Sequence, residues 1–123
     1  MRLSTLSAAL VLGSTSFVQA ADYHCTFVQR CAAAGCTDAT DLSLTLATAP
    51  DHALLTDPLG TRLLAALPAG GGLRSFAAHA GAVGEERAEM FSLYANGDFL
   101  YTTHVDGAAL VFVTGSGHCT GAS

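Results

Sequence analysis

The chain contains no lysine and no tryptophan among its 123 residues, and all five of its basic side chains are arginines. The missing lysine excludes Walker-type phosphate loops and Schiff-base catalysis, because each requires a primary amine at a fixed position. The formal net charge is −5, whereas binding to nucleic acid requires clustered positive side chains that displace counterions. We therefore expect no nucleic-acid partner. The chain has the length of one domain and is too short for a doubly wound nucleotide-binding fold.

The first twenty residues have the pattern of a secretory signal peptide. Arg2 gives a positive start, an apolar run follows at 6–12, and Val18 and Ala20 place compact residues at −3 and −1 of a cleavage point. A membrane anchor would need about 20 mostly apolar residues, and polar residues interrupt this run. We therefore expect the protein to be exported to the periplasm or the extracellular space, without stable insertion in the membrane. Residues 1–20 are expected to be cleaved, and residues 21–123 to form a single β-rich domain.

All four cysteines, Cys25, Cys31, Cys36 and Cys119, follow the predicted signal peptide. An even number of cysteines in a small exported domain indicates disulfides, and four cysteines allow three pairings. We favour Cys31–Cys36, which bracket a short loop, and Cys25–Cys119, which lie near opposite ends of the domain. Redox and zinc sites need closer cysteine spacings. The long-range disulfide would stabilise the fold by about 4–5 kcal/mol in the chain-entropy model.

The spacing of turn residues predicts an all-β domain. Turn signals recur every eight to twelve positions, which favours a small antiparallel sandwich or barrel of about 7–8 short strands. Residues 42–46 and 23–27 alternate apolar and polar side chains as strands do. Residues 57–60 and 70–72 are predicted to be loops. Residues 61–67 fit either a strand or one turn of helix.

The last third of the chain predicts a three-stranded antiparallel meander. Asn96-Gly97 and Asp106-Gly107 are the dipeptides that two-residue type I′ turns favour, because both central residues of that turn need a positive φ. Across the first turn, this register places Tyr94 opposite Phe99. Across the second turn, it places Tyr101 opposite Phe112.

Apolar side chains occur on both faces of this predicted meander, unlike a half-exposed antiparallel sheet. Four aromatic residues, Tyr94, Phe99, Tyr101 and Phe112, share the second face of the meander and form the predicted aromatic face. We take it as the candidate binding surface, because exposed apolar patches mark interaction sites. The alternative is that another segment, such as residues 61–67, covers it. The first face, expected to be core, carries Phe91, Leu93, Leu100, Val111 and Val113, and the second carries Tyr94, Phe99, Tyr101 and Phe112 together with Met90 and Leu110.

Histidines provide the second candidate site. His24 and His118 each precede a cysteine of the predicted long-range disulfide, so both imidazoles would lie on the outer surface as diagonal neighbours. Copper or zinc could bind there, although two histidines make a weak site without a third ligand, and solvated surface histidines are the alternative. The predicted register also places His104 opposite Glu89, as a proton-transfer pair or a simple charge pair.

No catalytic motif or cofactor motif is found. The sequence Thr114-Gly115-Ser116-Gly117 lacks the first glycine of the Gly-x-Ser-x-Gly hydrolase turn. We therefore expect an exported, non-catalytic binding module whose partner is a protein or a small apolar ligand. The alternative is a metal-binding protein that uses surface histidines, and a hydrolase is the third hypothesis.

Overall fold

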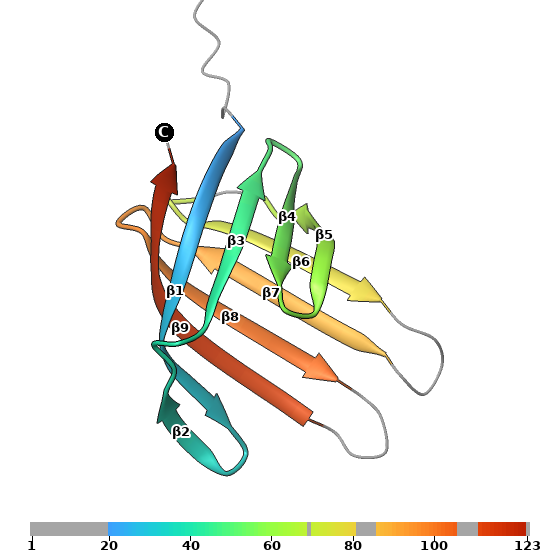
Figure 1. Cartoon of the computed structure of the whole chain (residues 1–123). Helices are drawn as coiled ribbons and strands as arrows, with labels where there is room; N and C mark the ends of the chain where they lie inside the picture. Colours follow the sequence, from blue (N-terminus) through green and yellow to red (C-terminus); the bar gives the residue numbers. More distant parts are fainter. Residues whose placement is uncertain (1–19, 69, 81–85, 106–110, 123) are drawn as a thin grey trace, which may run out of the picture.

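The computed structural model describes residues 20–68, 70–80, 86–105 and 111–122 (Figure 1). Within these ranges the regular structure consists of nine β-strands, so the predicted all-β fold is confirmed, and no helix is long and apolar enough to cross a membrane. Most of the predicted signal peptide, residues 1–19, lies outside the described residues. The strands are β1 (Ala21–Ala32), β2 (Gly35–Asp38), β3 (Ser43–Thr48), β4 (His52–Asp57), β5 (Gly60–Ala66), β6 (Arg74–Ala80), β7 (Arg87–Leu93), β8 (Asp98–Val105) and β9 (Val111–Ala122).

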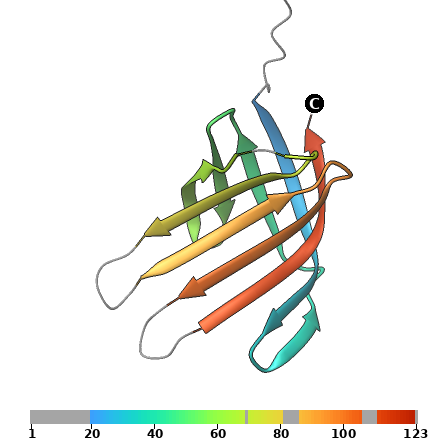
Figure 2. The same cartoon turned by 180° about the vertical axis from the view of Figure 1, so that it is seen from behind.

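Eight strands form a closed antiparallel barrel. Strands β3 to β9 follow one another in chain order, and β1 pairs with both β3 and β9 and so closes the sheet. Strand β2 is an additional strand that pairs with the second half of β1. Figure 2 shows β6, β7, β8 and β9 side by side as one long twisted layer. A barrel of this strand number has an interior just wide enough for side chains or one small ligand.

The barrel opens at one end, between β5 and β6. Only two residue pairs join these strands, Ala65 with Ala77 and Ala66 with Phe76. Beyond them β6 diverges from β5 (Figure 1). We call this end, which contains the β4–β5 turn, the open end of the barrel.

The core follows the strand period of two. Alternate residues of β3 and β4 point inward, and Leu46, Leu55 and Leu64 are fully buried together with Phe76 and Phe91. Residues 61–67 belong mostly to β5, so this ambiguous segment is a strand, and its Arg62 reaches the inner face of the meander at Glu89. The predicted strands at 23–27 and 42–46 and the turn at 57–60 are also found in the structure.

Both predicted disulfides are present. Cys25 of β1 lies directly opposite Cys119 of β9, and their bond joins positions 94 residues apart in the chain. Cys31 and Cys36 join β1 to β2. The first disulfide therefore fastens the two strands that close the barrel.

The predicted register of the first meander turn is wrong by one residue. Tyr94 and Asp98 close a three-residue loop, in which Gly97 has a φ of 94° and donates its N–H to the Tyr94 carbonyl oxygen. Among the described residues only glycines have a positive φ. Asn96 therefore does not form a type I′ turn, and the geometry is that of a type I turn followed by a glycine bulge. A shift of one residue moves every side chain of a strand to the other face.

The predicted register of the second meander turn is also wrong. Asp106-Gly107 lies outside the described residues, but the flanking strands pair Val105 with Val111. Tyr101 consequently lies opposite Gly115 and not opposite Phe112, which pairs with His104. The connection is thus five residues long, where the dipeptide predicted two.

Candidate ligand site at the open end of the barrel

The predicted aromatic face does not exist as one surface. Phe99 and Tyr101 point into the barrel and are 2% and 8% exposed, whereas Tyr94 lies outside and is 45% exposed. The side chain of Phe112 lies outside the described residues. The one-residue register shift explains the division, because it places Phe91 opposite Tyr101 on the inner face of the barrel.

The inward aromatic rings form a cluster across the barrel. Phe27 of β1 meets Phe99 edge to face, with ring centroids 5.0 Å apart, and Phe91 stacks on Phe99 at 5.1 Å. Tyr101 lies 6.3 Å from Phe27 and from Phe91. Such contacts add to the burial of apolar area. Phe99 therefore belongs to the core, and Tyr101 stands at its edge toward the open end.

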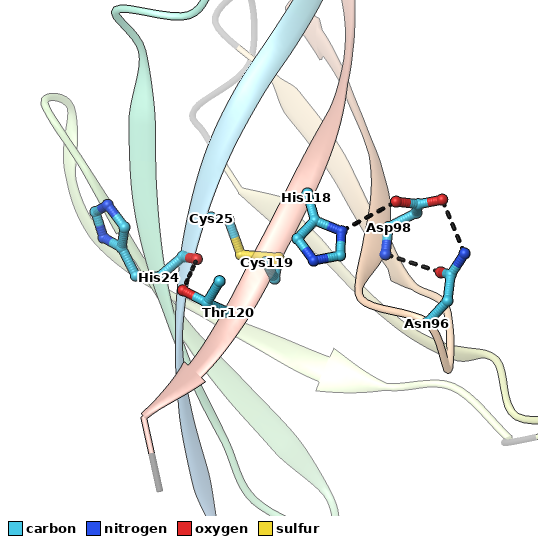
Figure 3. The surroundings of a disulfide bond; sticks show 7 residues. All are labelled: His24, Cys25, Asn96, Asp98, His118, Cys119 and Thr120. Carbon is cyan, nitrogen blue, oxygen red and sulfur yellow. Dashed lines mark hydrogen bonds and ion pairs between the residues drawn. A yellow bond between two sulfur atoms is a disulfide. The ribbon is translucent and has the colours of Figure 1, made fainter.

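His24 and His118 are exposed diagonal neighbours, as predicted, but their rings do not converge. Figure 3 shows them on either side of the Cys25–Cys119 disulfide, pointing away from each other. The His118 Nδ1 lies 3.1 Å from Asp98 Oδ1 on the neighbouring strand. Among the described residues, no three His, Cys, Asp or Glu side chains gather as metal ligands would.

The predicted pair of His104 and Glu89 is also wrong. Because of the register shift, His104 lies opposite Ala88 and is exposed, while Glu89 lies opposite Thr103 and is 4% exposed. Glu89 points into the barrel instead, where it meets an arginine that the sequence reasoning did not single out.

Arg62 of β5 joins two carboxylates inside the open end. Its Nε donates to Glu89 at 2.7 and 3.0 Å, and its two terminal nitrogens donate to Asp57 at 2.8 Å each. Tyr101 donates its hydroxyl to Glu89 Oε2 at 2.8 Å. We call these four side chains the inner network. The inner network ties the β4–β5 hairpin to β7 and β8. Each of its charged groups forms hydrogen bonds with another member, as buried charges require.

The inner network fixes the charge state of its members. The hydrogen bonds from Arg62 hold the pKa of Asp57 below its ordinary value of 3.8. Burial, followed by the hydrogen bond to Glu89, raises the pKa of Tyr101 to about 12. The two carboxylates raise the pKa of Arg62, with the Asp57 hydrogen bond as the largest contribution. At neutral pH the phenol is therefore a neutral donor, and Asp57 and Arg62 are charged.

A pocket of about 290 Å³ lies on one side of the inner network. Its apolar wall comes from elements far apart in sequence: β1, the loop before β3, the β4–β5 turn and β9. Tyr101 and Asp57 form the boundary with the inner network. We call this space the mouth pocket. Its remaining lining residues are Phe27, Arg30, Leu42, Ser43, Pro58, Leu59, Thr103, Val113 and Gly115.

Two features of the backbone shape the mouth pocket. A β-bulge in β1 leaves Val28 unpaired between Phe27 and Gln29. Arg30, which would otherwise face outward, thus shares the inner face with Gly115, the residue opposite it. The ring of Phe27 lies over Gly115, where a Cβ would overlap it. The glycine thus makes room for the ring that forms one wall of the pocket.

A second, smaller pocket of about 240 Å³ lies on the other side of the inner network. Arg62 and Glu89 line it, together with His79 and Arg87. The inner network therefore separates the mouth pocket from the opening between β5 and β6. Asp57 is near Arg87 as well, since that guanidinium contributes to the lowered pKa of its carboxyl.

Of the three predicted binding residues whose side chains the structure describes, Tyr94, Phe99 and Tyr101, only Tyr101 lines the mouth pocket. Sequence reasoning missed Phe27, Arg30, Asp57 and Arg62 as site residues, because their juxtaposition depends on barrel closure and on a bulge that no turn signal marks. No family model, curated protein or solved structure matches this chain, so its function is inferred from its own residues.

Proposed function

We propose that this protein is an exported, disulfide-stabilised domain that binds a small apolar ligand without chemical conversion, and that the ligand occupies the mouth pocket. The observation that carries this proposal is the apolar wall of that pocket, where Phe27, Leu59 and Val113 meet at the open end of a closed barrel. Ligand sites in proteins are concave and mostly apolar, with a few polar groups that fix orientation, and barrel mouths are common places for them.

The size of the pocket limits the ligand. Its volume of about 290 Å³ is at the lower end of the range for small-molecule sites, roughly 300–1,000 Å³. We therefore infer a compact molecule, comparable to a medium-length aliphatic chain or two to three aromatic rings. The barrel core behind Tyr101 is filled by Phe91 and Phe99, so the ligand would enter only the open end.

The chemistry of the lining supports binding over catalysis. None of the described residues that line the mouth pocket is a histidine or a cysteine. Its acid, Asp57, is engaged by Arg62, and the raised pKa of Tyr101 keeps its phenol protonated. General acid–base catalysis at neutral pH requires a group whose pKa lies near the working pH, and neither group meets this condition.

Export is supported by the two disulfides, which are compatible with an oxidising compartment. Sequencing the N-terminus of the protein isolated from the culture medium or the periplasm tests this part of the proposal. Ala21 is the expected first residue, and a protein that begins at Met1 in that fraction would contradict cleavage.

The binding proposal is tested with N-phenyl-1-naphthylamine, a neutral apolar dye whose fluorescence rises in apolar surroundings. The wild-type protein should bind it saturably at one site. Leu59→Asp places a charge on the pocket wall at a residue that is 69% exposed, so the fold should survive. We expect at least a tenfold loss of affinity, because the new carboxylate would lose hydration against the apolar dye.

Leu67→Asp is the matched control. Leu67 is also exposed, at 42%, and it does not line the mouth pocket. This variant should bind the dye as the wild type does. Equal weakening by both substitutions, or no saturable binding to the wild type, would contradict the proposed site.

A further inference from the structure

We propose that the ligand of the mouth pocket is anionic, a compact apolar molecule with a carboxylate or similar head that Arg30 binds. This inference rests on the proposed function and adds the charge of the ligand. It follows from where the β1 bulge directs Arg30, from how the other charges at the open end are paired, and from a buried hydroxyl in the same pocket.

Arg30 is exposed and lines the mouth pocket, and its backbone position is fixed by the bulge. The bulge at Val28 turns Arg30 to the inner face, and the Cys31–Cys36 disulfide fastens the adjacent hairpin. Backbone hydrogen bonds from Ala39 to the carbonyl oxygen of Val28 and from Phe27 to that of Leu42 anchor both sides of the bulge. In the described part of the chain, Arg30 forms no ion pair with a carboxylate.

The other arginines of the described strands have different surroundings. Arg62 is fully engaged by Asp57 and Glu89. Arg74 donates to the Ala49 carbonyl oxygen and lies 4.9 Å above the Phe76 ring, in another part of the barrel. Arg87 lines the second pocket, so among the described residues Arg30 is the one guanidinium at the mouth pocket. A guanidinium can bind a carboxylate through two parallel hydrogen bonds.

The charge balance at the open end favours an anion. Among the described residues that line the two pockets, three arginines stand beside two acids, so this lining has a formal charge of +1 on a chain whose formal net charge is −5. The acid that lines the mouth pocket, Asp57, is neutralised by Arg62 and has Arg87 nearby. Such a local positive field on an acidic protein attracts and orients small anions.

Thr103 provides a further polar contact. Its Oγ1 is buried and has no hydrogen-bond partner among the described residues, and Thr103 lines the mouth pocket. Buried hydroxyls are normally hydrogen-bonded. Across the sheet Val113 lies opposite Thr103, while Gly115 lies opposite both Tyr101 and Arg30. The hydroxyl and the guanidinium therefore belong to neighbouring rows of the same inner face, and one small ligand could contact both.

The test compares octanoate with 1-octanol, two probes of equal chain length that differ in charge. Their binding is measured by isothermal titration calorimetry of the exported protein as isolated. Wild type should bind octanoate about tenfold more tightly than octanol, as a charge-assisted hydrogen bond predicts. In Arg30→Gln this advantage should disappear while octanol affinity stays unchanged. Added NaCl should weaken octanoate binding more than octanol binding.

Arg74→Gln is the control that removes one positive charge elsewhere, and it should keep the preference for octanoate. Equal affinities of wild type for the two probes, or an octanoate preference that survives in Arg30→Gln, would overturn the anionic ligand while leaving the proposed function in place. Failure of wild type to bind either probe would overturn both proposals.

Discussion

At the scale of single residues, the barrel interior has to accommodate Glu89, a carboxylate with 2% of its side chain exposed. A buried charge of this kind is tolerated only when partners with good geometry compensate its lost hydration. Arg62 supplies two hydrogen bonds and Tyr101 supplies a third. Arg62 also holds Asp57, so one guanidinium compensates two acids at the boundary of the proposed ligand site.

Replacing Arg62 by leucine should therefore cost about 3–5 kcal/mol of unfolding free energy, because it leaves a buried carboxylate uncompensated. The double variant Arg62→Leu/Glu89→Gln should be more stable than the single one, since it removes that charge. Arg74→Leu is the control, because Arg74 bonds a backbone carbonyl, lies over the Phe76 ring and pairs with no acid among the described residues. Urea denaturation at neutral pH measures the free energy of unfolding of all three variants. An Arg62→Leu variant within 1 kcal/mol of the wild type would show that Glu89 is not buried in this way.

At the scale of strands and turns, the Tyr94–Asp98 loop decides which side chains are core. Asn-Gly favours a hairpin turn in general, and the sequence shows that a hairpin forms here. The loop length depends on Asn96, whose side chain accepts a hydrogen bond from the Asp98 N–H and donates one to the Asp98 carboxylate. Such local side-chain bonding stabilises alternative turns. The dipeptide alone does not distinguish the two loop lengths. The prediction therefore placed the inner side chains of β8 on its outer face and the outer ones on its inner face.

Strand β9 shows why the glycines in this region matter. A Cβ at Gly117 would overlap the carbonyl oxygen of Thr26 and lie 2.8 Å from the Cα of Phe27, both of the partner strand. Backbone atoms cannot move aside as a flexible side chain can. The close approach of β1 and β9 near their disulfide thus depends on the absence of a side chain at this position.

We expect Gly117→Ala to destabilise the fold by about 1–3 kcal/mol or more, as overpacking does. Gly121→Ala is the matched control in the same strand, since its Cβ would lie at ordinary contact distance, 3.6 Å, from Tyr23. That substitution should change stability by less than about 0.5 kcal/mol. Thermal unfolding followed by circular dichroism distinguishes the two. Equal midpoints for the two variants would contradict the close β1–β9 packing.

At the scale of the whole molecule, the sequence predicted the architecture better than the site. Turn spacing and strand alternation predicted the all-β fold, and the chain positions of the cysteines predicted the disulfide that closes the barrel. The mouth pocket combines residues of β1, β4, β8 and β9. Arg62 and Glu89 are 27 residues apart in sequence, and only barrel closure brings them together. Local patterns contain no information on such contacts.

The central claim, that a small ligand binds at the open end of the barrel, is tested most directly by locating the bound molecule. The measurement is a ¹H–¹⁵N correlation spectrum of the uniformly labelled protein during titration with N-phenyl-1-naphthylamine. We predict the largest shift changes at the amides of Leu59, Thr103 and Gly115, which line the mouth pocket. Changes concentrated at Tyr94 and Leu100, on the outer surface of the barrel, would contradict the account.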